Sequence, residues 1–144
     1  MSQTTIDIPV FHEEIFPRPR LEMILDTAFS KPLIVIHAGA GFGKTMAASQ
    51  YLTARNYRTV WFSCSGQDNI PIRFWAHLSR VFSQHRPTLG NLMKTLGFPE
   101  TLRMFDHFLS DLTRELYHDS STVAFVFDDL HLIPEPVVQD LMLH

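Results

Sequence analysis

The stretch that decides the fold is residues 33–45, Leu-Ile-Val-Ile-His-Ala-Gly-Ala-Gly-Phe-Gly-Lys-Thr. Its apolar first part, 33–37, predicts a buried strand, and a glycine-rich loop at 38–45 leads into a helix-forming stretch. The glycines let the backbone curl so that successive N–H groups point inward at an anion. The helix that follows presents the positive end of its dipole to the same anion. The pattern therefore predicts a nucleotide phosphate-binding loop between a strand and a helix.

Each residue type in this loop has a part in the predicted chemistry. Lys44 supplies a mobile cation for the β- and γ-phosphates and a catalytic charge, and the Thr45 hydroxyl is a hard ligand for Mg²⁺. The first position of the G-x-x-x-x-G-K-[ST] pattern is Ala38, which still permits closure if its backbone is extended. We expect the nucleotide to be held by Gly39, Ala40, Gly41, Phe42, Gly43, Lys44, Thr45 and Met46.

A second motif lies at residues 123–129, Val-Ala-Phe-Val-Phe-Asp-Asp. The continuous apolar run predicts a strand buried on both faces of a parallel sheet, and its carboxyl end lies where open α/β sheets bind ligands. We expect Asp128 to hold Mg²⁺ through water, and Asp129 to orient or deprotonate the attacking water. An Asp pair after a strand can instead cap the next turn, but the upstream loop favours the metal site. Neither motif distinguishes adenine from guanine.

Length and composition narrow the class of protein. The 144 residues are enough for one domain, and 45% hydrophobic residues is an ordinary globular fraction. A net charge of −3 without a basic stripe argues against nucleic-acid binding by this segment. The single cysteine, Cys64, predicts a buried, unreactive thiol. Because no signal peptide or membrane-spanning run is visible, we expect a cytoplasmic protein without membrane contact.

Strands that alternate with helices predict an α/β fold, a three-layer P-loop NTPase with a parallel sheet. Residues 1–17 form an N-terminal arm, and 18–144 form a partial NTPase domain with Walker A at 38–45 and Walker B at 123–129. Expected strands are 33–37, 59–64 and 123–129, and expected helices are 21–29, 44–55, one capped by Asp68 or Asn69, 101–117, and a last one after Pro134.

Three finer expectations concern the remaining segments. The helix after residue 69 carries an apolar stripe of Ile72, Trp75, Leu78 and Phe82, which we assign to the core and not to base stacking. Residues 86–100 contain two prolines and two glycines, which predicts a connecting segment with at most a short helical turn. His131 is either a sensor near the γ-phosphate or a loop histidine. Arg18 and Arg20 are either solvated charges or an arm near the nucleotide base.

Several segments together carry a resemblance to a known family. They are Phe16-Pro-Arg-Pro-Arg-Leu21, residues 37–45, Val60-Trp-Phe-Ser63, Asp68-Asn69, Phe74-Trp75, and Phe127-Asp-Asp-Leu-His-Leu-Ile133. In this order they resemble the N-terminal ATPase module of the large MalT-like, LuxR-type transcriptional regulators, members of the STAND class of NTPases. The resemblance runs from about Phe16 to the end. Alanine at position 38 is usual in that family, whereas Gly39 replaces a common proline and Leu130 a frequent tyrosine.

The resemblance implies ATP and Mg²⁺, with nucleotide exchange and hydrolysis acting as a switch. An inducer favours an ATP-bound, self-associating form, and DNA is contacted through a C-terminal helix-turn-helix that lies outside this chain. In this class a further strand lies between the P-loop strand and the Asp-Asp strand, and the chain ends before it. We therefore expect a truncated sheet with a gap or nonnative pairing, at a cost of about 1–3 kcal/mol for each unsatisfied group.

Two other functions fit the same motifs. A small-molecule P-loop kinase uses the same loop but also needs a lid with arginines and a carboxylate that binds the acceptor. A nonhydrolysing nucleotide-binding remnant would retain the loop without turnover.

Overall fold

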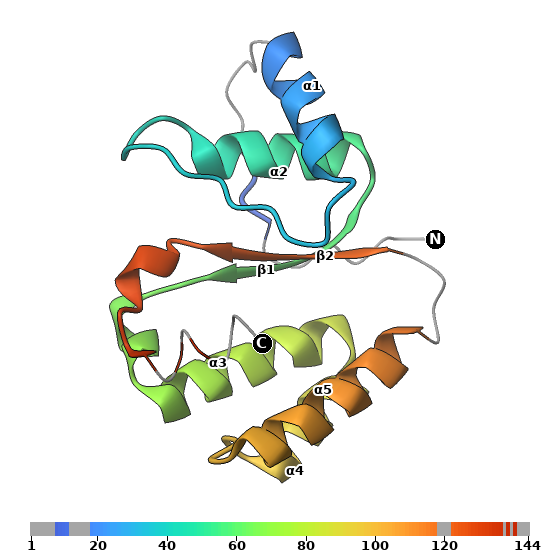
Figure 1. Cartoon of the computed structure of the whole chain (residues 1–144), viewed down its shortest axis with the longest axis vertical. Coiled ribbons are helices and arrows are strands. Elements are labelled where there is room, and N and C mark those ends of the chain that lie inside the picture. Colours follow the sequence, from blue (N-terminus) through green and yellow to red (C-terminus); the bar gives the residue numbers. More distant parts are fainter. Residues whose placement is uncertain (1–7, 12–17, 118–121, 137, 139, 141–144) are drawn as a thin grey trace. The chain divides into compact units, whose positions relative to one another are not determined.

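The computed structural model describes residues 8–11, 18–117, 122–136, 138 and 140, and it confirms the predicted α/β class. The chain divides into two compact units, and the boundary between them falls between Tyr57 and Arg58. Figure 1 labels the elements of both. No helix within the described ranges is long and apolar enough to cross a bilayer.

The first unit, residues 8–57, contains the helices α1 (Pro19–Ala28) and α2 (Lys44–Ala54). Pro19 occupies the first turn of α1, where its missing N–H costs nothing. The Tyr51 hydroxyl of α2 donates to Asp26 Oδ1 of α1 at 2.7 Å, and the rings of Phe29 and Tyr51 lie 4.7 Å apart. On the other side of α2, Ser49 Oγ donates to the Pro9 carbonyl at 2.7 Å. The described part of the predicted N-terminal arm is therefore attached to α2.

The predicted strand at 33–37 does not form. These residues are without regular structure, and Leu33 and Val35 are 72% and 80% exposed. An apolar run becomes a strand only when a neighbouring strand pairs with its backbone groups. Within the part of the chain that the structure describes, no strand pairs with 33–37, so this prediction was wrong.

The second unit contains strand β1 (Arg58–Ser63), which pairs in parallel with β2 (Val123–Asp128). The register joins Arg58 to Val123 and Ser63 to Asp128, so the carboxyl ends of the two strands coincide. The parallel sheet is thus confirmed for these two strands. Between them the chain forms a 3₁₀ turn η1 (Gly66–Asn69) and helices α3 (Pro71–His85), α4 (Pro87–Leu96) and α5 (Leu102–Tyr117).

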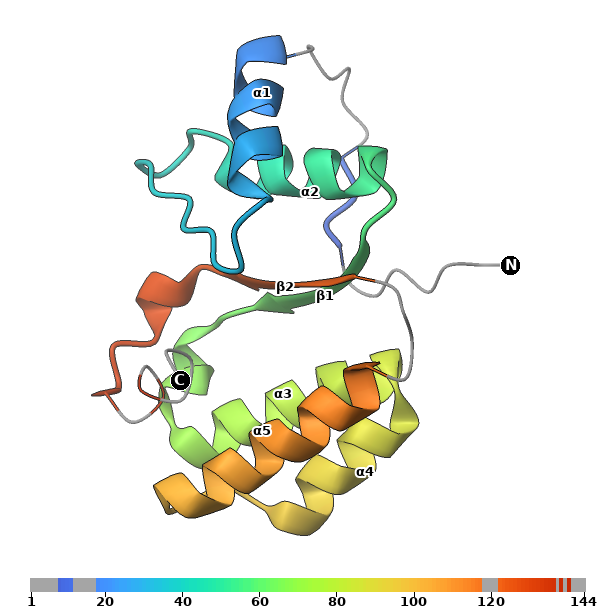
Figure 2. The ribbon, with the colours of Figure 1, turned by 45° about the vertical axis from the view of Figure 1, so that its right-hand side comes forward.

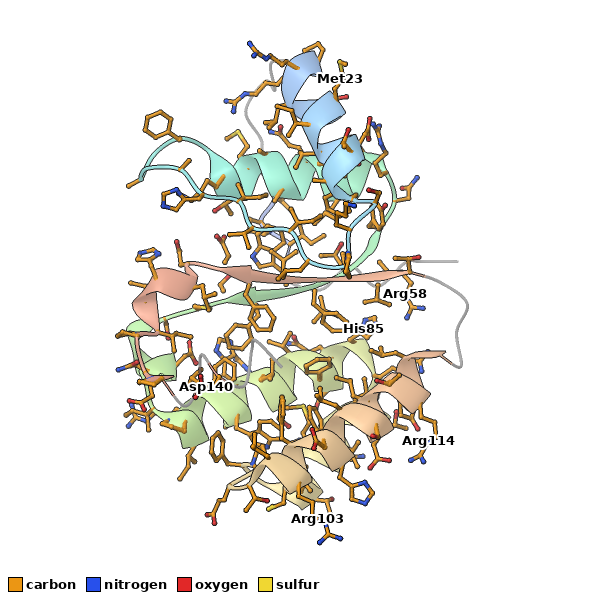
Figure 3. The ribbon with its side chains drawn as sticks, viewed as in Figure 1. Met23, Arg58, His85, Arg103, Arg114 and Asp140 are labelled. Carbon is orange, nitrogen blue, oxygen red and sulfur yellow. The ribbon has the colours of Figure 1, made fainter. Side chains whose placement is uncertain are left out.

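Helices α3, α4 and α5 lie on the same side of the two strands (Figure 2). Val60 and Phe62 of β1 enter a core shared with these helices, while Arg103 and Arg114 of α5 point away from it (Figure 3). This arrangement gives one sheet layer and one helical layer within the unit, and the third layer of the predicted architecture stays a prediction. The buried core residues that α3, α4 and α5 contribute are Phe74, Trp75, Leu78, Val81, Phe82, Leu89, Met93, Phe105 and Phe108.

Strand β2 is less buried than its sequence predicts. Phe125 packs on Phe82 and Phe127 on Phe62, with ring centroids 5.4 and 5.6 Å apart, yet each phenylalanine of β2 remains 37% exposed. The described sheet has two strands, so β2 has a hydrogen-bonded neighbour on one edge only. The expectation of burial on both faces was wrong, because β2 lies at an edge of the described sheet and its phenylalanines stay partly open to solvent there.

The segment 86–100 also differs from its prediction as a connecting segment, because most of it is helix α4. Its two glycines suggested a break, but each has a specific task. Gly97 takes φ 67° at the C-cap of α4, a conformation that favours glycine. A Cβ on Gly90 would lie 2.7 Å from the Ser83 Cα, so Gly90 lets α4 approach α3 closely.

Gly90→Ala is expected to lower the free energy of unfolding of the chain by about 1–3 kcal/mol, because the added methyl overpacks the contact with α3. Gly66→Ala is the matched control, since a Cβ there meets no atom within 4 Å. Urea unfolding followed by circular dichroism measures both. Equal midpoints for the two variants would show that the α3–α4 contact tolerates a side chain.

The start of α3 and its apolar stripe differ in detail from the prediction. The N-cap of α3 is Ile70 and not Asp68 or Asn69, and it makes no side-chain capping bond. Trp75 and Phe82 are core residues as predicted, but Ile72 is 72% exposed.

After β2 the chain forms a 3₁₀ turn, η2 (Leu130–Leu132). Of the predicted last helix, residues 136, 138 and 140 are helical, and residues 141–144 lie outside the described residues.

Candidate functional site

The glycine loop of the first unit has the backbone that its sequence demands. Gly41 and Gly43 have φ of 79° and 74°, in the left-handed region where a side chain is strained. Gly43 is also the N-cap of α2, and its carbonyl accepts the Ala47 N–H at 2.9 Å, as in the first turn of a helix. The loop therefore ends directly at the positive end of the α2 dipole, where an anion is stabilised.

Lys44 is the first residue of α2, and its side chain folds back over the loop. Its Nζ donates to the Ala38 carbonyl at 2.9 Å and to the Gly39 carbonyl at 3.1 Å. An ammonium group has three donors, so these two contacts leave one hydrogen for an anion. The charge is thereby fixed against the same loop whose glycines curl at the N-terminus of α2.

The other loop residues differ in exposure. Thr45 and Met46 are half-buried in the first turn of α2, whereas Phe42 is 74% exposed. A Cβ on Gly39 would lie 3.0 Å from a ring carbon of Phe42. Because that spacing is tighter than ordinary contact, a proline at position 39 would require the Phe42 ring to move. Glycine here, where the resembling family commonly has proline, matches the placement of this ring.

The Asp pair lies in the second unit, at the carboxyl end of β2. The Asp128 carbonyl accepts the Cys64 N–H at 2.9 Å, which extends the strand pairing by one bond. Asp128 Oδ1 accepts the N–H of Asp129 at 3.0 Å, and the turn η2 that follows has no side-chain capping bond. Asp129 takes φ 55°, ψ 34°, an uncommon left-handed conformation that aspartate adopts more readily than most residues. Its side chain is 55% exposed, with His131 Nδ1 4.0 Å from its Oδ1.

Carboxylates gather around the ends of both strands. Burial, together with the negative charges of Asp68, Asp128 and Asp129, raises the pKa of the Cys64 thiol to about 12. Cys64 is a free thiol and 5% exposed, in agreement with the predicted buried, unreactive cysteine. Within the described ranges, however, no group of three or more His, Cys, Asp or Glu side chains is arranged to hold a metal ion.

Sequence reasoning missed the role of Asp68, which is 2% exposed. Its carboxylate accepts the Ser65 N–H at 2.8 Å and the Ser65 hydroxyl at 2.7 Å, a capping box at the start of η1. His77 Nδ1 lies 2.9 Å from its other oxygen, and the His77 ring lies 4.3 Å from that of Phe62. The Ser-x-x-Asp spacing is the signal that could have revealed this contact.

The structure thus brings together two groups of predicted residues. Residues 38–46 lie together at the start of α2, and Asp128 and Asp129 lie together at the end of β2. The two groups belong to different units, and their joint site remains a prediction.

Comparison with known proteins gives three informative relatives. The HTH-type transcriptional regulators MalT of Klebsiella pneumoniae and Vibrio cholerae are 31% and 30% identical over 141 and 129 residues, or 93% and 87% of this chain. The serine/threonine-protein kinase PknK of Mycobacterium tuberculosis is 29% identical over 125 residues, or 85% of the chain. No family model matches.

These matches confirm the resemblance to the MalT-like regulators. The chain covers 15%, 14% and 11% of the three relatives, in the same order, so it corresponds to a small part of each.

Proposed function

We propose that this chain, a relative of the MalT transcriptional regulators over the region it spans, binds ATP and hydrolyses it as a regulatory switch. The observation that carries the proposal is the geometry around Lys44. Its ammonium is held on the Ala38 and Gly39 carbonyls, beside two glycines with positive φ and at the positive end of a helix. A curled glycine loop, a fixed cation and a helix dipole together suit a nucleotide polyphosphate.

Mg²⁺ and hydrolysis form the second part of the proposal. Thr45 and Asp128 would hold the cation, because hydroxyl and carboxylate oxygens are the hard ligands that Mg²⁺ prefers. The ion would neutralise charge on the phosphates during transfer. Asp129 would orient the attacking water and accept its proton. Asp128 and Asp129 lie together at the carboxyl end of β2, and this position supports a cation at this end of the sheet.

The regulatory role rests on the relatives. Two of them are named HTH-type transcriptional regulators, and the family resemblance implies an ATP-bound form that self-associates when an inducer is present. DNA would be contacted through a region outside this chain, whose net charge of −3 does not suit DNA. A cytoplasmic location follows from this role.

One observation favours a second candidate, the nonhydrolysing nucleotide-binding remnant. Residues 33–37 form no strand, so the described structure does not anchor the beginning of the loop to a sheet. Such a loop can bind phosphates, but hydrolysis needs the water and the phosphate held in a fixed geometry.

Equilibrium binding of a fluorescent ATP analogue, with and without Mg²⁺, tests the proposal on this 144-residue chain. We expect micromolar or tighter binding that Mg²⁺ strengthens, with release of inorganic phosphate over time. Binding without phosphate release would support the remnant. Absence of binding at millimolar nucleotide would refute both.

A further inference from the structure

Arg18 brings a second cation to the glycine loop. It is the N-cap of α1, and its guanidinium lies next to Gly43, the N-cap of α2. Nη1 and Nη2 are 3.7 and 3.9 Å from the position that a Cβ on Gly43 would occupy. Because Lys44 follows Gly43 directly, two positively charged side chains lie at the start of one helix.

The backbone of Arg18 is held in place by α1. Its carbonyl accepts the N–H groups of Leu21 at 2.9 Å and Glu22 at 3.0 Å, and Pro19 restricts the next φ angle. The guanidinium therefore extends from a fixed point at the start of a helix.

Helix α1 is in turn tied to α2 near its other end. Asp26 of α1 accepts the Tyr51 hydroxyl at 2.7 Å and Arg55 Nη2 at 2.7 and 2.9 Å. These hydrogen bonds, from Arg55 first and Tyr51 second, lower the pKa of Asp26 and keep it charged. Helix α1 thus contacts the α2 segment at two places. Asp26 bonds to Tyr51 and Arg55 at one of them, and Arg18 lies beside Gly43 at the other.

Arg18 and Arg55 differ in whether a described carboxylate neutralises their charge. Asp26 neutralises Arg55, whereas no described carboxylate forms an ion pair with Arg18. Two cations at the positive end of a helix dipole repel each other and the dipole. An anion bound between them would remove that repulsion, and a guanidinium donates two parallel hydrogen bonds to phosphate oxygens.

We propose that Arg18 binds the phosphate groups of the nucleotide held by residues 38–46 and so favours nucleotides over nucleosides. This inference rests on the proposed function. It assigns Arg18 to the phosphates, where the sequence left solvent or the nucleotide base as alternatives. Lys44 and Arg18 would then clamp the polyphosphate from the two helix starts, α2 and α1.

The test is the affinity of the 144-residue chain and its variants for ATP, ADP and adenosine, measured by competition with a fluorescent nucleotide. We expect Arg18→Ala to weaken ATP and ADP binding about 10- to 100-fold, the loss of one charge-assisted bidentate contact. Arg18→Lys keeps the charge but not the fork and should lose less. Adenosine affinity should not change. Arg20→Ala, which removes an exposed arginine two residues away, is the matched control and should bind like the parent.

The outcomes separate this inference from the proposed function. If the parent chain does not bind ATP, the proposed function fails. If Lys44→Ala abolishes binding while Arg18→Ala behaves like Arg20→Ala, the function stands and the role of Arg18 is overturned. Equal losses for ATP and adenosine would place Arg18 at the base and also overturn it. Should alanine alter the far-UV spectrum, Arg18→Gln, which keeps the side chain as far as Cδ with a polar end and removes the charge, replaces it in every comparison.

Discussion

Replacing Lys44 with alanine is expected to abolish ATP binding by the chain. The ammonium group is fixed by the carbonyls of Ala38 and Gly39 and would donate its remaining hydrogen to a phosphate oxygen. A lost charge-assisted contact costs about 1.5–3 kcal/mol, and the two loop carbonyls would also lose their donor, so the affinity should fall at least about 100-fold. Isothermal titration calorimetry with Mg²⁺-ATP measures the difference.

Lys31→Ala is the control for this experiment. Lys31 is an exposed lysine of the same unit, and its backbone N–H bonds to Ala28 just after α1. Its removal changes the net charge by the same amount, so general electrostatic attraction is matched. If Lys44→Ala binds ATP as tightly as Lys31→Ala, the loop is a glycine-rich turn without a nucleotide.

Asp129→Asn is expected to leave ATP binding intact and to slow hydrolysis by about 10²- to 10⁴-fold, the usual contribution of a general base. Asparagine is the informative substitution because Asp129 has φ 55°, and asparagine accepts this left-handed backbone at little cost. The variant therefore removes the charge and keeps the turn. Phosphate release under single-turnover conditions measures the chemical step apart from binding.

Asp106→Asn serves as the control, since Asp106 is an exposed aspartate on α5. The measurement is made in the 144-residue chain. Hydrolysis by Asp129→Asn at the parent rate would contradict the assignment of Asp129 as the catalytic base.

Local patterns predicted the elements that have a clear helical periodicity or a run of strand-forming residues. The predicted helix 101–117 is α5 to within one residue, because its apolar side chains recur every three or four positions. The expected strands 59–64 and 123–129 are β1 and β2, each within one residue. A parallel sheet was also predicted, but the direct pairing of these two strands was not.

The misses come from properties that a local pattern does not encode. Residues 33–37 have the composition of a strand, but strand formation depends on a neighbour. Gly90 suggested a break in the sequence pattern. It is needed instead for the close approach of α4 to Ser83, a tertiary contact that the local sequence does not reveal.

For the candidate site, the sequence identified residue types and the structure added their surroundings. The glycines, Lys44 and the Asp pair were recognisable because phosphate and Mg²⁺ chemistry restricts the residues that can serve. That Lys44 bonds to the Ala38 and Gly39 carbonyls, or that Arg18 lies beside Gly43, depends on side-chain placement across tens of residues. No periodicity reports such contacts.

The parallel pairing of β1 with β2 has a consequence for synthesis of the protein. Three helices separate the two strands in the chain, so β1 leaves the ribosome well before its partner exists. During that interval Val60, Trp61 and Phe62, each at most 3% exposed in the folded protein, have no sheet to join. Pairing of two strands that lie so far apart in the chain is slow, and until β2 is made the unpaired backbone of β1 can pair with a wrong strand. We expect nascent chains that stop before residue 123 to require chaperone binding at β1.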